Sequence, residues 1–137
     1  MQTVIFACVH NAGRSQIAAA FFNELADPAL ARALSAGTQP AERVHPEVVE
    51  AMDEVGIDLR DARPTKLTES LARRARVLVT MGCGEACPAI PGVQREDWPL
   101  PDPKGKAVDD VRRIRDEIRA RVLDLVMRAS VRRAPRQ

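Results

Sequence analysis

Short apolar runs rich in β-branched residues alternate with longer helical segments along this chain, and this alternation limits the fold most strongly. Such runs are typical of buried strands, and we expect four of them, at Thr3 to Ala7, Leu34 to Thr38, Arg76 to Met81 and Val93 to Trp98. Consecutive parallel strands need a crossover connection, which is usually a helix. The pattern therefore predicts an α/β fold with an open, four-stranded parallel sheet and helices on both of its faces.

The segments between these strands carry apolar residues at helical spacing. Pro46 suits the first turn of a helix, whereas Asp27-Pro28 and Gly56 mark helix ends. We expect helices at about residues 14–26, 46–55, 68–75 and from 107 onward.

Length and composition limit the domain organisation. With 137 residues, 45% of them hydrophobic, the chain is long enough for one compact core and too short for two ordinary domains. We expect a single domain over residues 1–137, with a flexible tail at about 129–137. No apolar stretch approaches the ~20 residues of a membrane span, and no secretion leader is apparent. These features predict a cytoplasmic protein that does not bind membranes.

The charged residues are unevenly distributed. The net charge is only +2, yet the segment from Val111 onward contains nine arginines. A nucleic-acid site would also need aromatic platforms for the bases, and the chain has no Tyr, three Phe and one Trp. We therefore interpret the arginines as a solvated helix face and expect a monomer without a nucleic-acid partner.

Cys8 ends the first predicted strand and is followed by a loop and then by a helix that begins near Arg14. In open parallel sheets, ligands bind at the carboxyl ends of the strands. Backbone N–H groups in a tight loop at a helix N-terminus form an anion cradle, and Gly13 permits the close approach that this cradle needs. The sequence predicts a site for a tetrahedral oxyanion, made by Val9, His10, Asn11, Ala12, Gly13 and Arg14.

The same loop suits nucleophilic chemistry. The planar fork of Arg14 can hold two oxygens of the anion. The surrounding dipoles favour the thiolate form of Cys8, Ser15 can donate a hydrogen bond to that thiolate, and Asn11 can bond the loop backbone. The alternative is that Cys8 is only a small buried hydrophobic residue.

A thiolate that attacks an oxyanion needs an acid to protonate the departing oxygen. Asp102 lies between two prolines that stiffen its loop, and it is our candidate for this acid. Asp97 is the competing candidate, and a simple turn aspartate is the structural alternative for Asp102. His10 and His45 are interpreted as loop and helix-cap residues without a chemical role.

Two further cysteines, Cys83 and Cys87, follow the strongest predicted strand and therefore lie at the same edge of the sheet as Cys8. If Cys8 forms an adduct through its sulfur, Cys83 can attack that sulfur and expel a reduced product, after which Cys87 can attack Cys83. Residues four apart on a regular helix are too distant for a disulfide, so this pair should distort or unwind a helical turn. Zinc is the rival use of the three thiols with His10, but it would consume the nucleophile, and we expect no metal.

Four motifs resemble the arsenate reductases that are built on the low-molecular-weight protein tyrosine phosphatase fold. They are "CVHNAGRSQ", "HPEVVEAMDEVGID", "VLVTMGCGEACP" and "DWPLPDP", and the resemblance extends from Thr3 to about Met127. It implies that Cys8 attacks arsenate, that Arg14 and the loop amides hold the anion, and that Ser15 supports the thiolate.

The resemblance also implies a disulfide relay that serves arsenic detoxification. Asp102 protonates the leaving oxygen, arsenite departs when Cys83 attacks Cys8, and Cys87 carries the oxidation outward to thioredoxin. Because the compact "GCGEACP" spacing is similar to actinobacterial enzymes, some of which use mycothiol, an arsenate-mycothiol transferase is an alternative. The family's monovalent-cation site would involve Asn11 and Ser35, although its other ligands do not match around Thr65.

Two further functions stay open at this point. A phosphatase could hydrolyse phosphomonoesters through a phospho-intermediate on Cys8, with Asp102 as the acid. The phosphatases commonly place an aromatic residue after the Asp-Pro pair, whereas Lys104 follows Pro103 here, so the wall that stacks on phosphotyrosine is missing. A non-catalytic anion or redox sensor is the other alternative.

Overall fold

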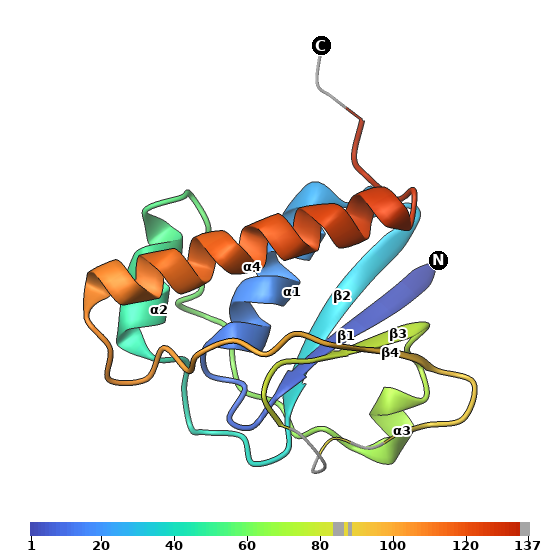
Figure 1. The fold of residues 1–137 in the computed structure, drawn as a ribbon, viewed down its shortest axis with the longest axis horizontal. Coiled ribbons are helices and arrows are strands. Elements are labelled where there is room, and N and C mark those ends of the chain that lie inside the picture. Colours follow the sequence, from blue (N-terminus) through green and yellow to red (C-terminus); the bar gives the residue numbers. More distant parts are fainter. Residues whose placement is uncertain (84–86, 88, 135–137) are drawn as a thin grey trace.

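The computed structural model describes residues 1–83, 87 and 89–134, and within them the chain forms a parallel sheet with helices on both faces (Figure 1). The strands are all parallel and stand in the order β2-β1-β3-β4. This arrangement confirms the open four-stranded α/β fold. The strands are β1 (Gln2–Cys8), β2 (Ala31–Gly37), β3 (Val77–Thr80) and β4 (Gln94–Asp97).

Three helices cover one face of the sheet and a short one covers the other (Figure 1). The larger layer consists of α1 (Arg14–Leu25), α2 (Pro46–Asp53) and α4 (Val108–Arg128), and the smaller one of α3 (Glu69–Ala72). α2 ends at Asp53, earlier than its apolar pattern suggests, which leaves the expected core residue Val55 40% exposed.

Each face of the sheet has its own core, because successive residues of a strand point to opposite sides. Val4, Phe6 and Cys8 pack with the larger helical layer, whereas Ile5 and Ala7 pack toward α3. The ring of Phe6 meets those of Phe22 and Trp98 at centroid distances of 6.0 and 5.6 Å. Trp98 is thus a packing residue.

The strand order places the end of β1 at the topological switch point. From β1 the chain moves to β2 on one side and then crosses back to β3 on the other. The register aligns Cys8 with Gly37 of β2, and Ala7 with Thr80 of β3. Cys8 therefore lies at the centre of the carboxyl edge, where ligands bind in sheets of this kind.

The segment after α4 differs from the flexible tail that the sequence predicted. Val131 is 3% exposed, Arg132 forms an antiparallel bridge with Ala26, and the N–H of Arg133 donates to the carbonyl of Leu25 at 2.8 Å. Burial of Val131 together with these backbone bonds holds residues 129–134 against the end of α1. Residues 135–137 lie outside the described part of the chain.

The arginines of α4 are largely engaged with carboxylates. Arg128 contacts both Glu96 and Asp124, and other arginines of this helix pair with acids three or four residues away. This agrees with a solvated helix face. No helix among the described residues is long and apolar enough to cross a membrane.

One cluster of charges joins α2 to α4. Arg115, buried to 8% exposure, donates to the carbonyl of Ala51 at 2.8 Å and to Glu54 at 2.9 Å. Arg112 donates to the same carboxylate at 2.9 Å. The hydrogen bond from Arg112, aided by that from Arg115, lowers the pKa of Glu54 from its usual 4.5 to about 2.

We predict that Glu54→Gln lowers the stability of the protein and flattens its dependence on acid pH. A carboxylate with a lowered pKa stabilises the folded state above the unfolded pKa of about 4.5, and this contribution is lost as the pH falls toward 2. Urea unfolding at several pH values between 2 and 6 measures the slope. Glu50→Gln, an exposed change in the same helix, should retain the wild-type slope, and equal slopes in the two variants would contradict the prediction.

Candidate active site

The loop after β1 is held from outside by the segment that follows β2. The N–H groups of residues 38, 39, 41 and 45 donate to the carbonyls of residues 8, 9, 10 and 12, at 2.8–3.1 Å. Gly37 makes this approach possible, because a Cβ there would lie 2.7 Å from the carbonyl oxygen of Val9. The loop is thus attached to its neighbour through its carbonyl groups.

This attachment also sets the direction of the loop amides. In a trans peptide the C=O group and the following N–H group point in opposite directions. Because the carbonyls of Cys8, Val9, His10 and Ala12 face the 38–45 segment, the N–H groups of the residues that follow each of them face away from it. These are the N–H groups of Val9, His10, Asn11 and Gly13, and amides turned away from a neighbouring segment are free to face an anion.

The side chain of Asn11 forms hydrogen bonds that hold the loop in place. It adopts a left-handed conformation, with φ of 50°, and it is fully buried. Its Oδ1 accepts hydrogen bonds from the N–H of Thr65 at 2.9 Å and from Nε2 of Gln16 at 3.2 Å. These two donors hold the Asn11 side chain in place. The monovalent cation that the resemblance implies stays a prediction. Ser35, its expected partner, is half-buried on β2.

The same residue directs a proton toward the sulfur of Cys8. Nδ2 of Asn11 donates to Oγ of Ser15 at 2.6 Å, and Oγ of Ser15 lies 2.9 Å from Sγ of Cys8. Since the Asn11 amide supplies a hydrogen to this oxygen, the hydroxyl hydrogen of Ser15 is available for the sulfur. Cys8 is a free thiol, 2% exposed. Ser15 therefore has the geometry expected of a thiolate donor.

Arg14 begins α1 and extends its guanidinium over the loop. The side chain is 9% exposed, with Nη1 donating to the carbonyl of Leu100 at 3.0 Å and Nη2 lying 3.8 Å from Oδ2 of Asp102. Gly82, with φ of 98°, lies against the other side, and a Cβ there would overlap Nη1 of Arg14. The Arg14 side chain thus contacts two distant segments, one at Gly82 and one at residues 100–102.

Of the two candidate acids, only Asp102 lies at the anion loop. Its Oδ2 approaches Arg14, its Oδ1 accepts from the N–H of Lys104 at 3.0 Å, and the adjacent Pro103 lies against Gly13. Asp102 is 42% exposed and so retains access to water.

Asp97, by contrast, is engaged on β4. It accepts a hydrogen bond from Thr80 and pairs with Arg95 at 3.2 Å. The bond from Thr80, with a further contribution from Arg95, lowers the pKa of Asp97. Because Asp97 is engaged on β4 whereas Asp102 approaches Arg14, Asp102 stays the candidate acid.

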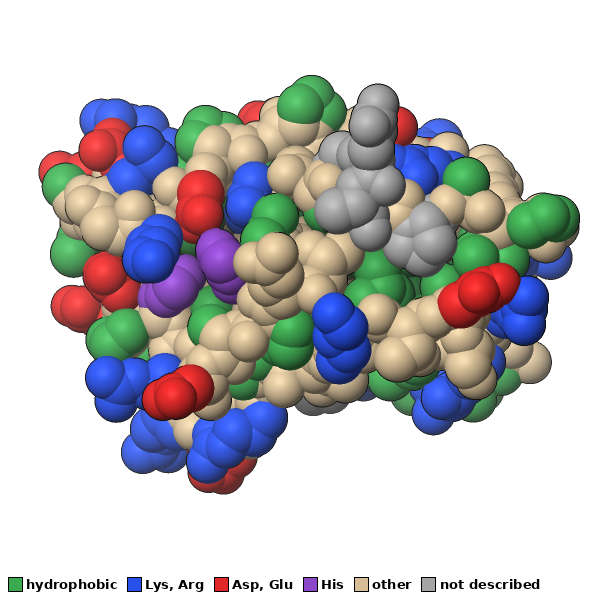
Figure 2. All heavy atoms as spheres, turned by 90° about the horizontal axis from the view of Figure 1, so that it is seen from below, with side chains coloured by type: hydrophobic (Ala, Val, Ile, Leu, Met, Phe, Trp, Pro, Cys, Tyr) green, Lys and Arg blue, Asp and Glu red, His purple; other side chains and the backbone are tan. Residues whose placement is uncertain are grey.

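Both histidines support the loop rather than the reaction. They lie next to each other on the face seen in Figure 2. Nδ1 of His10 bonds the carbonyl of Gln39 at 3.1 Å, and the backbone N–H of His45 donates to Ala12. Burial lowers the pKa of His45, although the charge of Asp102 acts in the opposite direction. Among the described residues, no cluster of His, Cys, Asp or Glu is placed to hold a metal ion.

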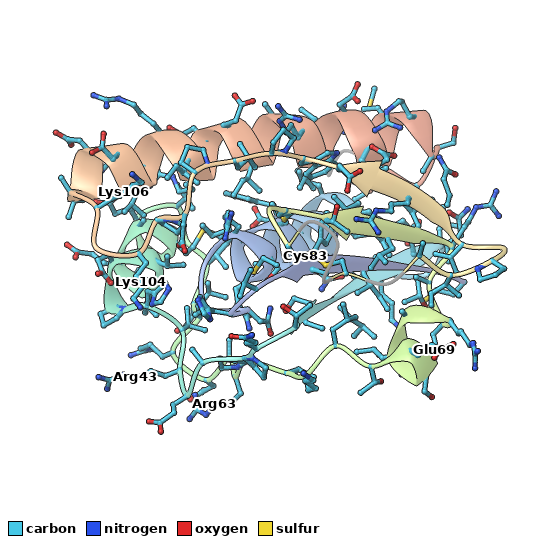
Figure 3. The ribbon with its side chains drawn as sticks, turned by 60° about the horizontal axis from the view of Figure 1, so that its bottom comes forward. Arg43, Arg63, Glu69, Cys83, Lys104 and Lys106 are labelled. Atoms are coloured by element: carbon cyan, nitrogen blue, oxygen red, sulfur yellow. A yellow bond between two sulfur atoms is a disulfide. The ribbon has the colours of Figure 1, made fainter. Side chains whose placement is uncertain are left out.

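The other two cysteines form a disulfide. The Cα atoms of Cys83 and Cys87 are 5.6 Å apart, neither residue is helical, and the two are 7% and 2% exposed. Sγ of Cys83 lies 3.9 Å from the carbonyl oxygen of Ala7, the residue before Cys8. Figure 3 shows Cys83 near the strand ends, away from Lys104 and Lys106 on the loop before α4.

The disulfide lies at the predicted edge of the sheet, but on the opposite face from Cys8. Cys83 and Cys87 lie at the carboxyl edge, as expected, but they pack into the core on the α3 face, whereas Cys8 belongs to the opposite core. Gly82, which precedes Cys83, has a positive φ of 98°. The disulfide and Cys8 thus lie at the same end of the sheet but on opposite faces of it.

Three supporting residues were not recognised from the sequence. Gly82 contacts Arg14, while Gln16 and Thr65 orient Asn11. A glycine directly after a buried strand was a usable signal of close backbone approach. No local pattern marks Gln16 or Thr65, because their roles depend on contacts between distant segments.

The family model described as low molecular weight phosphotyrosine protein phosphatase matches residues 3–136. The chain belongs to this family. An arsenate reductase of Brevibacillus brevis is 38% identical over 125 residues, which make up 88% of this chain and 91% of the relative.

Solved structures of arsenate reductases resemble most of the chain. A thioredoxin-dependent arsenate reductase of Corynebacterium glutamicum is 38% identical with a TM-score of 0.83, over 95% of this chain. The chain spans 62% of the length of that protein. An arsenate reductase of Archaeoglobus fulgidus is 31% identical with a TM-score of 0.76, over 90% of this chain and 98% of that one.

We predict that Gly82→Ala weakens oxyanion binding by about tenfold or more, because a Cβ at this position displaces the guanidinium of Arg14. Isothermal titration with sulfate, an oxyanion that does not react, measures the affinity. Gly92→Ala is the matched control, since Gly92 also has a positive φ, of 84°, but has open space around it. Both variants carry similar backbone strain, so equal affinities would contradict a role for the Arg14 contact.

We also predict that Ser15→Ala lowers the reactivity of Cys8. Loss of the hydrogen bond between Ser15 and the sulfur should slow alkylation of Cys8 by about tenfold. The rate of reaction of Cys8 with iodoacetamide, measured at one pH while the Cys83–Cys87 disulfide is intact, tests this. Ser35→Ala serves as the control, and an unchanged rate in Ser15→Ala would show that Ser15 does not act on the sulfur.

Proposed function

We propose that this chain reduces arsenate to arsenite with Cys8 as the nucleophile, Cys83 and Cys87 as a disulfide relay, and thioredoxin as the external reductant. One observation carries the proposal. A free, buried thiol in an anion loop and an oxidised pair of thiols lie at the same edge of one sheet. A phosphatase needs only the first of these features.

The first step is an attack on arsenic. The Cys8 thiolate, supported by Ser15, forms a bond to the arsenic of arsenate, while the loop amides and Arg14 hold the remaining oxygens. Asp102 donates a proton to the departing oxygen, which leaves as water. The 3.8 Å approach of Asp102 to Arg14 keeps the acid beside the group that orients the anion.

The second step is the reduction itself. Cys83 attacks the sulfur of Cys8, so that a Cys8–Cys83 disulfide forms and the sulfur–arsenic bond breaks. The electron pair of that bond stays on arsenic, which leaves as arsenite. Cys87 then attacks Cys83, which frees Cys8 and produces the Cys83–Cys87 disulfide. The dithiol of thioredoxin takes up this oxidation and returns both cysteines to thiols.

The relay requires the segment after β3 to move. In the oxidised form Cys83 packs on the α3 face, and its sulfur must pass the edge of the sheet to reach Cys8. Gly82 stands at the start of this segment with a positive φ, so it can act as the hinge. The exposed fractions of 7% and 2% also mean that a reductant needs the disulfide to open outward.

A reducing compartment suits these three thiols, and we place the protein in the cytoplasm, acting as a monomer without nucleic-acid or membrane partners. A small thiol such as mycothiol is the competing reductant. It would attack the arsenic adduct on Cys8 directly and leave Cys83 and Cys87 without a function. The buried disulfide therefore favours thioredoxin.

We predict that Cys83→Ser and Cys87→Ser each abolish repeated turnover of arsenate with thioredoxin, because either change interrupts the relay. NADPH consumption with thioredoxin, thioredoxin reductase and arsenate measures this activity. Any slow hydrolysis of p-nitrophenyl phosphate should persist in both variants and disappear in Cys8→Ser. Turnover that survives Cys83→Ser, or turnover with mycothiol instead of thioredoxin, would exclude the proposed relay.

A further inference from the structure

Arg95 connects the relay disulfide to the outer strand of the sheet. Its Nη1 donates to the carbonyl of Cys87 at 3.0 Å, and its Nε donates to Oδ1 of Asp97 at 3.2 Å. Thr80 donates to the same oxygen of Asp97. A chain of hydrogen bonds thus runs from Thr80 through Asp97 and Arg95 to the backbone of Cys87.

The sheet fixes the position of Asp97, and partial burial protects the hydrogen bonds of Arg95. Thr80 and Asp97 are register partners at the ends of β3 and β4, so the carboxylate is anchored at the edge of the sheet. The Arg95 side chain is only 28% exposed, which limits competition from water for its bonds. One planar guanidinium serves two acceptors at once, and a lysine cannot reproduce that fork.

The two cysteines of the relay are consequently held in different ways. Cys83 follows directly after Gly82, a glycine with positive φ at the end of a strand. Cys87 is tied through its carbonyl to the side chain of Arg95 on β4. Cys83 can therefore move by rotation at Gly82, whereas the bond to Arg95 restrains Cys87.

We propose that Arg95 is a positioning residue for the second thiol exchange, an inference that rests on the proposed function. In that exchange the Cys87 thiol gives its proton to solvent, and the thiolate attacks Sγ of Cys83. The Cys83–Cys87 bond forms, the Cys8–Cys83 bond breaks, and Cys8 leaves as a thiolate. Arg95 keeps the Cys87 backbone in the place to which Cys83 returns, which raises the effective concentration of the attacking sulfur.

The first test needs no arsenate. Arg95→Gln should lower the equilibrium constant for formation of the Cys83–Cys87 disulfide by about tenfold, equal to about 30 mV for a two-electron couple. Redox titration against dithiothreitol, with thiol counting by mass spectrometry, gives this value. Arg95→Lys should recover the wild-type constant only in part. Arg76→Gln, an exposed change at the start of β3, is the matched control and should leave the constant unaltered.

The second test follows the disulfides during one turnover. Reduced protein is mixed with arsenate, quenched, blocked with a thiol reagent and digested for mass spectrometry. Arg95→Gln should release arsenite as fast as wild type, because that release precedes the second exchange, but it should accumulate the Cys8–Cys83 disulfide. Asp97→Asn, which removes the negative charge beside Arg95, should produce a smaller accumulation and provides a second variant if Arg95→Gln does not fold.

The outcomes separate the two proposals. If wild-type protein releases no arsenite, the proposed function fails, yet the titration still tests whether Arg95 stabilises the Cys83–Cys87 pair. If Arg95→Gln and Asp97→Asn match Arg76→Gln in both equilibrium constant and disulfide distribution, the assignment of Arg95 is overturned.

Discussion

The site depends on the backbone bonds between the anion loop and the segment after β2. Four carbonyl groups of the loop are bound on its outer side, and peptide geometry then directs the neighbouring N–H groups inward. These backbone bonds hold the loop without help from a ligand. Asn11, buried and left-handed, adds the bonds to Ser15 and Thr65 that fix the loop between Cys8 and α1.

The three cysteines belong to two cores on opposite faces of the sheet. Cys8 ends a strand and points into the helical layer that contains α1, whereas the oxidised pair is buried against α3. Separation of this kind protects the disulfide from solvent after the oxidation has left Cys8. The proposed relay then requires Cys83 to move toward Cys8, so its chemistry is coupled to a conformational change.

The sequence predicted the parallel sheet and the edge at which all three cysteines lie, because hydrophobic periodicity and short-range spacing carry that information. Anion binding by the loop after β1 stays a prediction. The sequence could not place Cys83 and Cys87 on one face, since that depends on the path of the chain beyond Gly82. It left Asp97 and Asp102 as rivals, because the contacts of Asp102 with Arg14 and of Asp97 with Thr80 join distant segments of the chain. The packed segment around Val131 was missed because its partners lie at the far end of α1.

The contact between Gly82 and Arg14 has a thermodynamic consequence. Arg14, the proposed anion ligand, contacts Gly82, the proposed hinge of the relay. If anion binding changes the position of Cys83, the position of Cys83 must change anion affinity by the same factor, because linkage is reciprocal. Glycine is the residue that leaves room for this contact.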